Sequence, residues 1–107
     1  IASAHGATAQ FTFHRGYPVT VNHGAETDVM AAIARDIVGD SNVDTNAEPL
    51  MGGEDFSYML EARPGAMILI GNGDSAGLHH PEYDFNDEAI AHGISLWAKL
   101  AEANHAA

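Results

Sequence analysis

Residues 66–70, with the sequence Ala-Met-Ile-Leu-Ile, constrain the fold most, because they form a continuous apolar run bounded by glycines. Such a run predicts a strand that is buried on both faces. Residues 54–63 precede it with two acids and then an apolar helical pattern, which a Pro-Gly pair ends. A helix followed by a buried strand is typical of α/β folds, which place functional sites in loops beyond the carboxyl ends of their strands. A site is therefore expected in the next loop, residues 71–81.

Two further helices are expected on either side of this unit. Residues 26–38 carry apolar side chains at every fourth position, which predicts an amphipathic helix, and Gly39 is expected to end it. Near the carboxyl end, Asn86 is expected to cap a helix whose first turn is acidic. In the first helix, the apolar side is expected to consist of Val29, Ile33 and Ile37, with Met30, Ala34 and Val38 beside them. In the second helix, the buried stripe is expected to consist of Ile90, Ile94, Trp97 and Ala101.

The amino-terminal part of the chain predicts a separate strand. Residues 7–14 alternate polar with small or apolar residues, and Phe11 and Phe13 fall on the same side, which is typical of a half-buried strand. Pro18 has no N–H to give to a sheet, so the strand is expected to end before it, at a boundary between two subdomains. The sequence therefore predicts an α/β fold, in which a buried strand flanked by helices is preceded by one strand of another subdomain.

The charge of the chain restricts its partners. Fifteen acidic residues face only four lysines and arginines, for a formal net charge of -11. This balance argues against nucleic acid or an anionic membrane surface as the partner and suits metal cations, although a solvated acidic exterior is the commoner reason for it. There is no cysteine for a disulfide, no apolar run of about 20 residues and no signal peptide. A soluble, cytoplasmic protein is expected, and a first residue other than methionine suggests a processed or truncated product.

A pair of histidines, His79 and His80, lies between a glycine-rich loop and an acidic segment. Metal sites often use this arrangement, which makes His79 a candidate ligand; the alternative is a surface histidine, the expectation for the scattered histidines elsewhere in the chain. A first-row metal takes about four ligands or more. Because the HExxH, CxxC and His-x-His patterns are absent, this chain is expected to hold a minority of the ligands. The acids that could join His79 are Glu54, Asp55, Glu82 and Asp84.

Residues 52–55, Gly-Gly-Glu-Asp, form a second candidate segment. Adjacent glycines allow a backbone to approach another group closely. The simpler interpretation is a helix start, because acids in a first turn complement the helix dipole. Other site classes are less favoured: Ser57 and Ser75 have no nucleophile-elbow context, and the glycines of residues 71–77 open no helix that could hold a dinucleotide.

Three segments, read together, resemble a known family. They are residues 51–56 (Met-Gly-Gly-Glu-Asp-Phe), residues 66–73 (the apolar run with its Gly-Asn-Gly) and residues 78–87 (Leu-His-His-Pro-Glu-Tyr-Asp-Phe-Asn-Asp). In order and spacing they resemble the carboxy-terminal part of the dinuclear-metal amidohydrolases and peptidases, which include hippurate hydrolase, bacterial N-acyl-amino-acid amidohydrolases, plant auxin-conjugate hydrolases, aminoacylase and zinc carboxypeptidases. The resemblance extends over essentially the whole chain and is greatest to the hippurate hydrolase branch.

The resemblance implies a role for each part of the chain. Residues 1–17 resemble the end of the family's inserted dimerisation (lid) domain, and residues 18–107 resemble the C-terminal part of its metal-dependent catalytic domain. His79 matches the family's last metal ligand, whereas His80 is not expected to bind metal. A further match is to a loop beside the family's active site. That loop is expected to shape the floor of the site and to make hydrogen bonds around the metal ligands. The matching residues here are Gly52, Gly53, Glu54 and Asp55.

The resemblance also implies a reaction. It is hydrolysis of the amide bond of a hippurate-like N-acyl amino acid or a small peptide, with two divalent metals, which could be zinc, manganese, cobalt or nickel. The general base and the other ligands would lie before Ile1, so no catalytic residue is expected here. The chain would then be the C-terminal piece of a longer, homodimeric enzyme, inactive without its amino-terminal part. The alternative is a free-standing small α/β module that binds a ligand or partner, or associates with itself.

Overall fold

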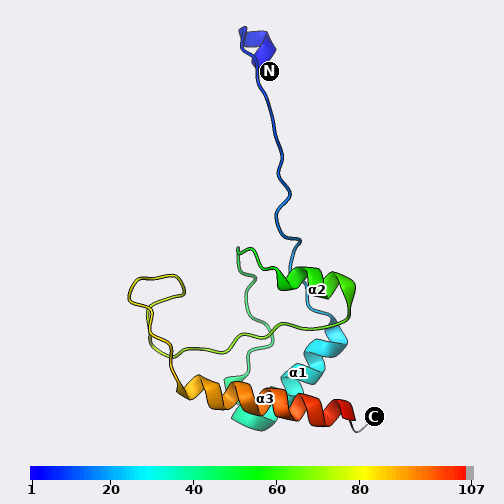
Figure 1. Cartoon of the computed structure of the whole chain (residues 1–107), viewed down its shortest axis with the longest axis vertical. Helices are drawn as coiled ribbons and strands as arrows, with labels where there is room; N and C mark the ends of the chain where they lie inside the picture. The colour runs from blue at the N-terminus through cyan, green and yellow to red at the C-terminus, as the bar shows by residue number, and fades with distance from the viewer. Residues whose placement is uncertain (106–107) are drawn as a thin grey trace.

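The computed structural model describes residues 1–105, in which all regular secondary structure is helical. No helix in this range combines the length and the apolar character that crossing a bilayer requires. The α-helices are α1 (Gly24–Val38), α2 (Phe56–Ala62) and α3 (Glu88–His105), and short 3-10 helices occur at η1 (Ala2–His5) and η2 (Asp40–Asn42). Helix α1 packs against α3 and contacts η2, whereas η1 lies far from this pair (Figure 1).

The core is small and lies between α1 and α3. Its buried centre consists of Met30 and Ala34 from α1 and Leu96 from α3. At the exposed edge of the same contact, Lys99 of α3 forms an ion pair with Asp36 of α1. Because solvent screens such a pair, it contributes less than about 1 kcal/mol, and the apolar contacts hold the two helices together. Half-buried apolar residues that surround the centre are Ile33, Ile37, Val43, Ala66, Ile68 and Leu100.

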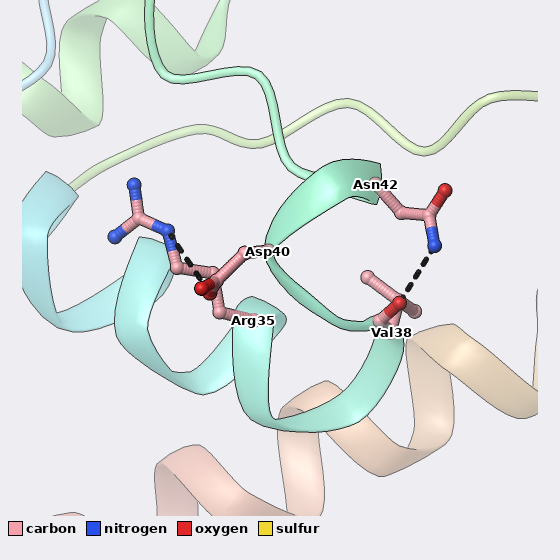
Figure 2. A network of polar contacts seen from close by, with 4 residues as sticks. All are labelled: Arg35, Val38, Asp40 and Asn42. Atoms are coloured by element: carbon pink, nitrogen blue, oxygen red, sulfur yellow. Dashed lines mark hydrogen bonds and ion pairs between the residues drawn. The ribbon is translucent and has the colours of Figure 1, made fainter.

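Helix α1 ends at Gly39, as the sequence predicts. Gly39 has φ 84° and ψ 155°, a conformation that is essentially restricted to glycine. Its N–H donates to Arg35 O over 2.8 Å, and Asn42 Nδ2 donates to Val38 O over 2.7 Å (Figure 2). The Arg35 Nε and Asp40 Oδ1 atoms are 4.0 Å apart, at the limit of an ion pair. The hydrogen bonds of Gly39 and Asn42 satisfy carbonyl groups at the end of the helix.

The buried face of α1 falls within the predicted apolar side. Met30 and Ala34 are buried and Ile33 and Ile37 are half-buried, as expected, whereas Val29 is exposed. One residue corresponds to a rotation of about 100° around the helix axis, so the face toward α3 is centred nearer to Met30 and Ala34 than to Val29.

The buried face of α3 is not the predicted one. Leu96 is only 4% exposed and packs against α1, whereas Ile94 and Trp97 are 64% and 68% exposed. Helix α3 is apolar on two sides, and α1 covers the side that carries Leu96. The predicted stripe therefore faces away from the core, and we call it the outer stripe. Its members, all exposed, are Ile90, Ile94, Trp97 and Ala101.

The predicted α/β fold is wrong for this chain, because residues 1–105 contain no strand. Residues 66–70 are not assigned to any helix or strand, and two open grooves of about 540 and 450 Å³ border them. Leu69 and Ile70 are 63% and 47% exposed, so the run is not buried on both faces. A strand needs a second strand to pair with its N–H and C=O groups. Here the main-chain groups of Met67 pair with a side chain instead: Asn22 Nδ2 donates to Met67 O and Met67 N donates to Asn22 Oδ1, both over 2.8 Å.

The strand predicted at residues 7–14 is also absent. This segment leads away from the helices towards η1 as a single arm (Figure 1). Phe11 and Phe13 lie together, with ring centroids 6.5 Å apart, but they are 86% and 70% exposed. The arm helps to raise the radius of gyration to 19.8 Å, against about 13 Å for a compact domain of this length. The alternating pattern predicts a face to bury, and no described residue covers that face.

Candidate functional site

Residues 71–87 form a loop whose two ends are held together by one side chain, that of Asn72. Its Oδ1 accepts a hydrogen bond from Asn86 N, and its Nδ2 donates to Asp84 O, each over 2.7 Å. The same Nδ2 donates to Ser75 Oγ over 2.7 Å. We call Asn72 with its main-chain partners at Asp84 and Asn86 the Asn72 clamp. It closes the base of the loop that projects beside the start of α3 (Figure 1).

The residues next to the clamp explain why the chain turns there. Gly73 has φ 80°, which glycine adopts without steric cost, so the chain reverses directly after Asn72. On the other side, Asn86 Oδ1 accepts a hydrogen bond from Glu88 N over 3.0 Å, which confirms the predicted cap of α3. Asn72 is not predicted as a functional residue by any motif. Its position between two glycines at the start of a long loop is the signal that could identify it.

His79 lies in the exposed part of this loop with an unusual backbone conformation. Its φ is 67°, and no other non-glycine residue among residues 1–105 has a positive φ. This left-handed conformation costs about 1–2 kcal/mol for a residue with a Cβ atom. Such strain concentrates at binding and active sites, so the backbone of His79 is consistent with a functional position.

The neighbouring His80 makes the hydrogen bonds that hold the turn. Its N–H donates to Gly77 O over 3.1 Å, and its O accepts from Tyr83 N over 2.9 Å. Its ring Nδ1 accepts from Glu82 N over 3.1 Å. Within the part of the chain that the structure describes, no hydrogen bond reaches the His79 ring. The two adjacent histidines therefore differ: the ring of His80 is engaged in the turn, and the ring of His79 is exposed without a partner.

The Gly52-Gly53 pair makes a close approach at one of its two positions. A Cβ atom at Gly53 would lie 3.2 Å from Tyr17 Cδ2, tighter than an ordinary contact, whereas Gly52 has open space around it. The Tyr17 ring packs edge to face on Tyr58 of α2, with ring centroids 5.9 Å apart. The expectation of a close backbone approach is confirmed for Gly53, and its neighbour is an aromatic ring of the same chain.

The two acids that follow have different roles at the start of α2. Glu54 Oε1 accepts a hydrogen bond from Phe56 N over 3.0 Å, and Glu54 O accepts one from the buried hydroxyl of Ser57 over 2.6 Å. Asp55 is exposed and its side chain makes no capping hydrogen bond. The interpretation of this segment as a helix start is confirmed, but both acids precede the first turn of α2, which carries no acid. Glu54 is the residue that satisfies the first N–H group of the helix.

The described residues do not assemble a metal centre by themselves. Among residues 1–104, whose side chains the structure describes, there is no group of three or more His, Cys, Asp or Glu side chains placed to hold a metal ion. A site with about four ligands therefore cannot be built from His79 and the predicted acids. The donor set of the described residues is therefore too small for a dinuclear centre.

The chain matches the family described as peptidase family M20/M25/M40 over residues 5–103. It is 36% identical to YhaA of Bacillus subtilis strain 168, an amidohydrolase by name, over 98% of the chain and 28% of that protein. It is 36% identical to hippurate hydrolase of Campylobacter jejuni over 78% of the chain and 22% of the relative. It is 34% identical to IAA-amino acid hydrolase ILR1-like 2 of Arabidopsis thaliana over 78% of the chain and 20% of the relative.

The chain thus spans between 20% and 28% of the length of these relatives. No solved structure matches it. The resemblance to amidohydrolases and peptidases inferred from the sequence is confirmed. The family match includes both the Gly52–Asp55 segment and the His79 loop. Since that match covers nearly all of its residues, the chain belongs to peptidase family M20/M25/M40.

Proposed function

We propose that this chain supplies one side of the active site of a metal-dependent amidohydrolase. The substrate is a hippurate-like N-acyl amino acid or a small peptide, whose amide bond is hydrolysed. Family membership supports the reaction class. The names of two relatives, hippurate hydrolase and IAA-amino acid hydrolase, support the substrate class.

His79 is the residue of this chain that we assign to the metal centre. The observation that carries the assignment is the contrast between the two histidines: the His80 ring holds the turn, while the His79 ring is exposed on a strained, left-handed backbone. Neutral imidazole is a common ligand of first-row metals. The whole protein is proposed to hold two divalent metals, and the remaining ligands and the general base are proposed to lie outside these residues.

The Gly52–Asp55 segment is proposed to shape the floor of the same site. Gly53 lies against Tyr17, and the Glu54 carboxylate is occupied by the start of α2, which suits a structural role better than direct chemistry. Residues 1–17 are proposed to belong to a dimerisation domain and residues 18–107 to the catalytic domain. Tyr17 would then lie at the boundary of the two parts.

The outer stripe of α3 supports a role as part of a longer protein. Its side chains are exposed although they are apolar, and apolar surface gains about 25 cal/mol for each Å² that is removed from water. The relatives are several times longer than this chain. We propose that another part of the same polypeptide covers the outer stripe and completes the site, and that the whole enzyme is a homodimer.

A second candidate function follows from the same exposed surface. The chain would act as a small module that binds a partner or associates with itself, without catalysis. The exposed apolar side chains of the outer stripe and of the arm, including Phe11 and Phe13, favour it. Sedimentation of the isolated chain tests the self-associating form of this module: a discrete oligomer that resists dilution supports it, and a monomer argues against self-association.

The amidohydrolase proposal is tested in a longer protein that contains these residues. His79→Ala is compared with His80→Ala and with the wild type, by hydrolysis of hippurate and by bound metal per chain. We expect His79→Ala to lower activity by more than about 100-fold, because even residues that only surround metal ligands cost about 10- to 100-fold. His80→Ala keeps most of the activity. Equal activity of His79→Ala and wild type would refute the assignment.

A further inference from the structure

We propose that Asn72 is a positioning residue for His79, which holds the His79 loop in the geometry that a metal ligand requires. The inference rests on the proposed role of His79 and adds a residue to it. Asn72 would not touch the metal or the substrate. It would act through its hydrogen bonds to the main chain on the far side of the loop. These bonds join its side chain to Asp84 O and to Asn86 N, each over 2.7 Å.

The first argument is that no other hydrogen bond closes the base of the loop. All of residues 71–87 are described, and no backbone–backbone hydrogen bond joins residues 71–76 with residues 82–87. The Asn72 side chain bridges these segments, to positions 12 and 14 residues further along the chain. Closing a flexible loop of this length costs conformational entropy, and the clamp is the contact that opposes the opening.

The second argument is that the turn around His79 is only locally determined. The hydrogen bonds of His80 to Gly77, Glu82 and Tyr83 all lie within the turn itself. They fix the left-handed backbone of His79, but they do not fix where the turn lies relative to α3. The clamp does so, because Asn86 also caps α3 through its own side chain.

The third argument is that the clamp uses both ends of the amide. The Oδ1 atom accepts from Asn86 N, and the Nδ2 atom donates to Asp84 O and to Ser75 Oγ. Asn72→Asp keeps an acceptor for Asn86 N but removes the donor to Asp84 O. Asn72→Ala removes all three hydrogen bonds. The two substitutions therefore separate a partial from a complete loss of the clamp.

The experiment uses the longer protein in its metal-free form. Zinc affinity is measured by competition with a chromophoric chelator, and amide hydrogen exchange is followed in the loop. The variants are Asn72→Ala, Asn72→Asp and His79→Ala. The control is Asn46→Ala, which removes an exposed asparagine whose side chain makes no hydrogen bond within residues 1–105.

We expect Asn72→Ala to weaken zinc binding at one site by about 10- to 100-fold, the effect typical of residues that orient metal ligands. Asn72→Asp gives an intermediate loss, and the Asn46→Ala control binds as the wild type does. Loop exchange accelerates in the order of the affinity losses. A residue with only a structural role would lower the melting temperature and speed exchange without changing zinc affinity.

The outcomes distinguish the two proposals. Wild-type zinc affinity in both Asn72 variants, with weaker binding in His79→Ala, overturns the positioning role and leaves His79 as a ligand. Wild-type affinity in His79→Ala overturns the metal role of His79 and the positioning role with it. If Asn72→Ala does not fold, Asn72→Asp decides the question. Wild-type zinc affinity in Asn72→Asp, together with faster loop exchange, also overturns the inference.

Discussion

Leu96 offers the sharpest test of how α3 packs. The helix carries two apolar faces, and the structure buries Leu96 while it leaves Ile94 exposed. Leu96→Ala should therefore destabilise the fold, and Ile94→Ala should have little effect. The sequence pattern alone predicts the opposite ranking, because Ile94 belongs to the outer stripe and Leu96 does not.

The magnitude for Leu96→Ala follows from its surroundings. Truncating a buried leucine costs about 2–5 kcal/mol, depending on the cavity that remains. Leu96 and Ala34 line the open groove of about 540 Å³, so neighbouring groups and water can reach part of the vacated volume. We therefore expect a loss near the lower end of that range, about 2 kcal/mol. For a small domain of marginal stability, such a loss is a large fraction of the free energy of unfolding.

The matched control, Ile94→Ala, should be close to neutral. Ile94 is 64% exposed, so truncation loses about a third of the 1.5–3 kcal/mol that full burial of such a side chain provides. Alanine has the higher helix propensity, by about 0.4 kcal/mol, which offsets much of that loss. Urea unfolding of both variants, followed by helical circular dichroism, gives the two free energies. A greater loss for Ile94→Ala than for Leu96→Ala would refute the packing described here.

Three further substitutions and one optical measurement follow from the same structure. Gly39→Ala should cost about 1–3 kcal/mol in urea unfolding, because φ 84° with ψ 155° suits glycine alone; an unchanged midpoint would contradict this. Gly93→Ala should instead stabilise α3 by about 0.5–1 kcal/mol, since the new Cβ meets only Ile70 Cδ1 at 3.7 Å; a lower midpoint would count against it. His79→Gly should raise stability by about 1 kcal/mol through relief of the left-handed backbone, and equal stability would argue against strain there. Acrylamide should quench Trp97 fluorescence efficiently in the isolated chain, whereas weak quenching would mean that the outer stripe is covered.

The helices could be predicted from the sequence because their signals are local. Gly39 ends α1 and Asn86 caps α3, and each acts on groups within a few residues of itself. Glu54 starts α2 in the same way. Such contacts depend on residue type and on short spacing, which the sequence displays directly.

The two strand predictions and the predicted buried face of α3 were wrong for a different reason. The apolar character of residues 66–70 and the alternation of residues 7–14 indicate surface that gains from burial, but a strand exists only where a second backbone pairs with it. The outer stripe and Leu96 are both apolar, so the pattern alone does not say which side α1 covers. Each wrong prediction depends on a packing or pairing partner that is distant in the sequence or is not among the described residues.

In the candidate site, too, local features could be predicted from the sequence and long-range contacts could not. The difference between His79 and His80 is set within a turn of a few residues. The sequence favours His79 over His80 through the family resemblance of residues 78–87, and the role of His79 as a ligand stays a prediction. The Asn72 clamp joins groups 12 and 14 residues apart, and no local rule selects that pairing among the polar residues of the loop. The described residues contain a strained backbone at His79, a turn held by His80 and a loop base held by Asn72. If His79 binds metal as proposed, these contacts, all made within the chain, should hold the loop in the same geometry before the metal binds.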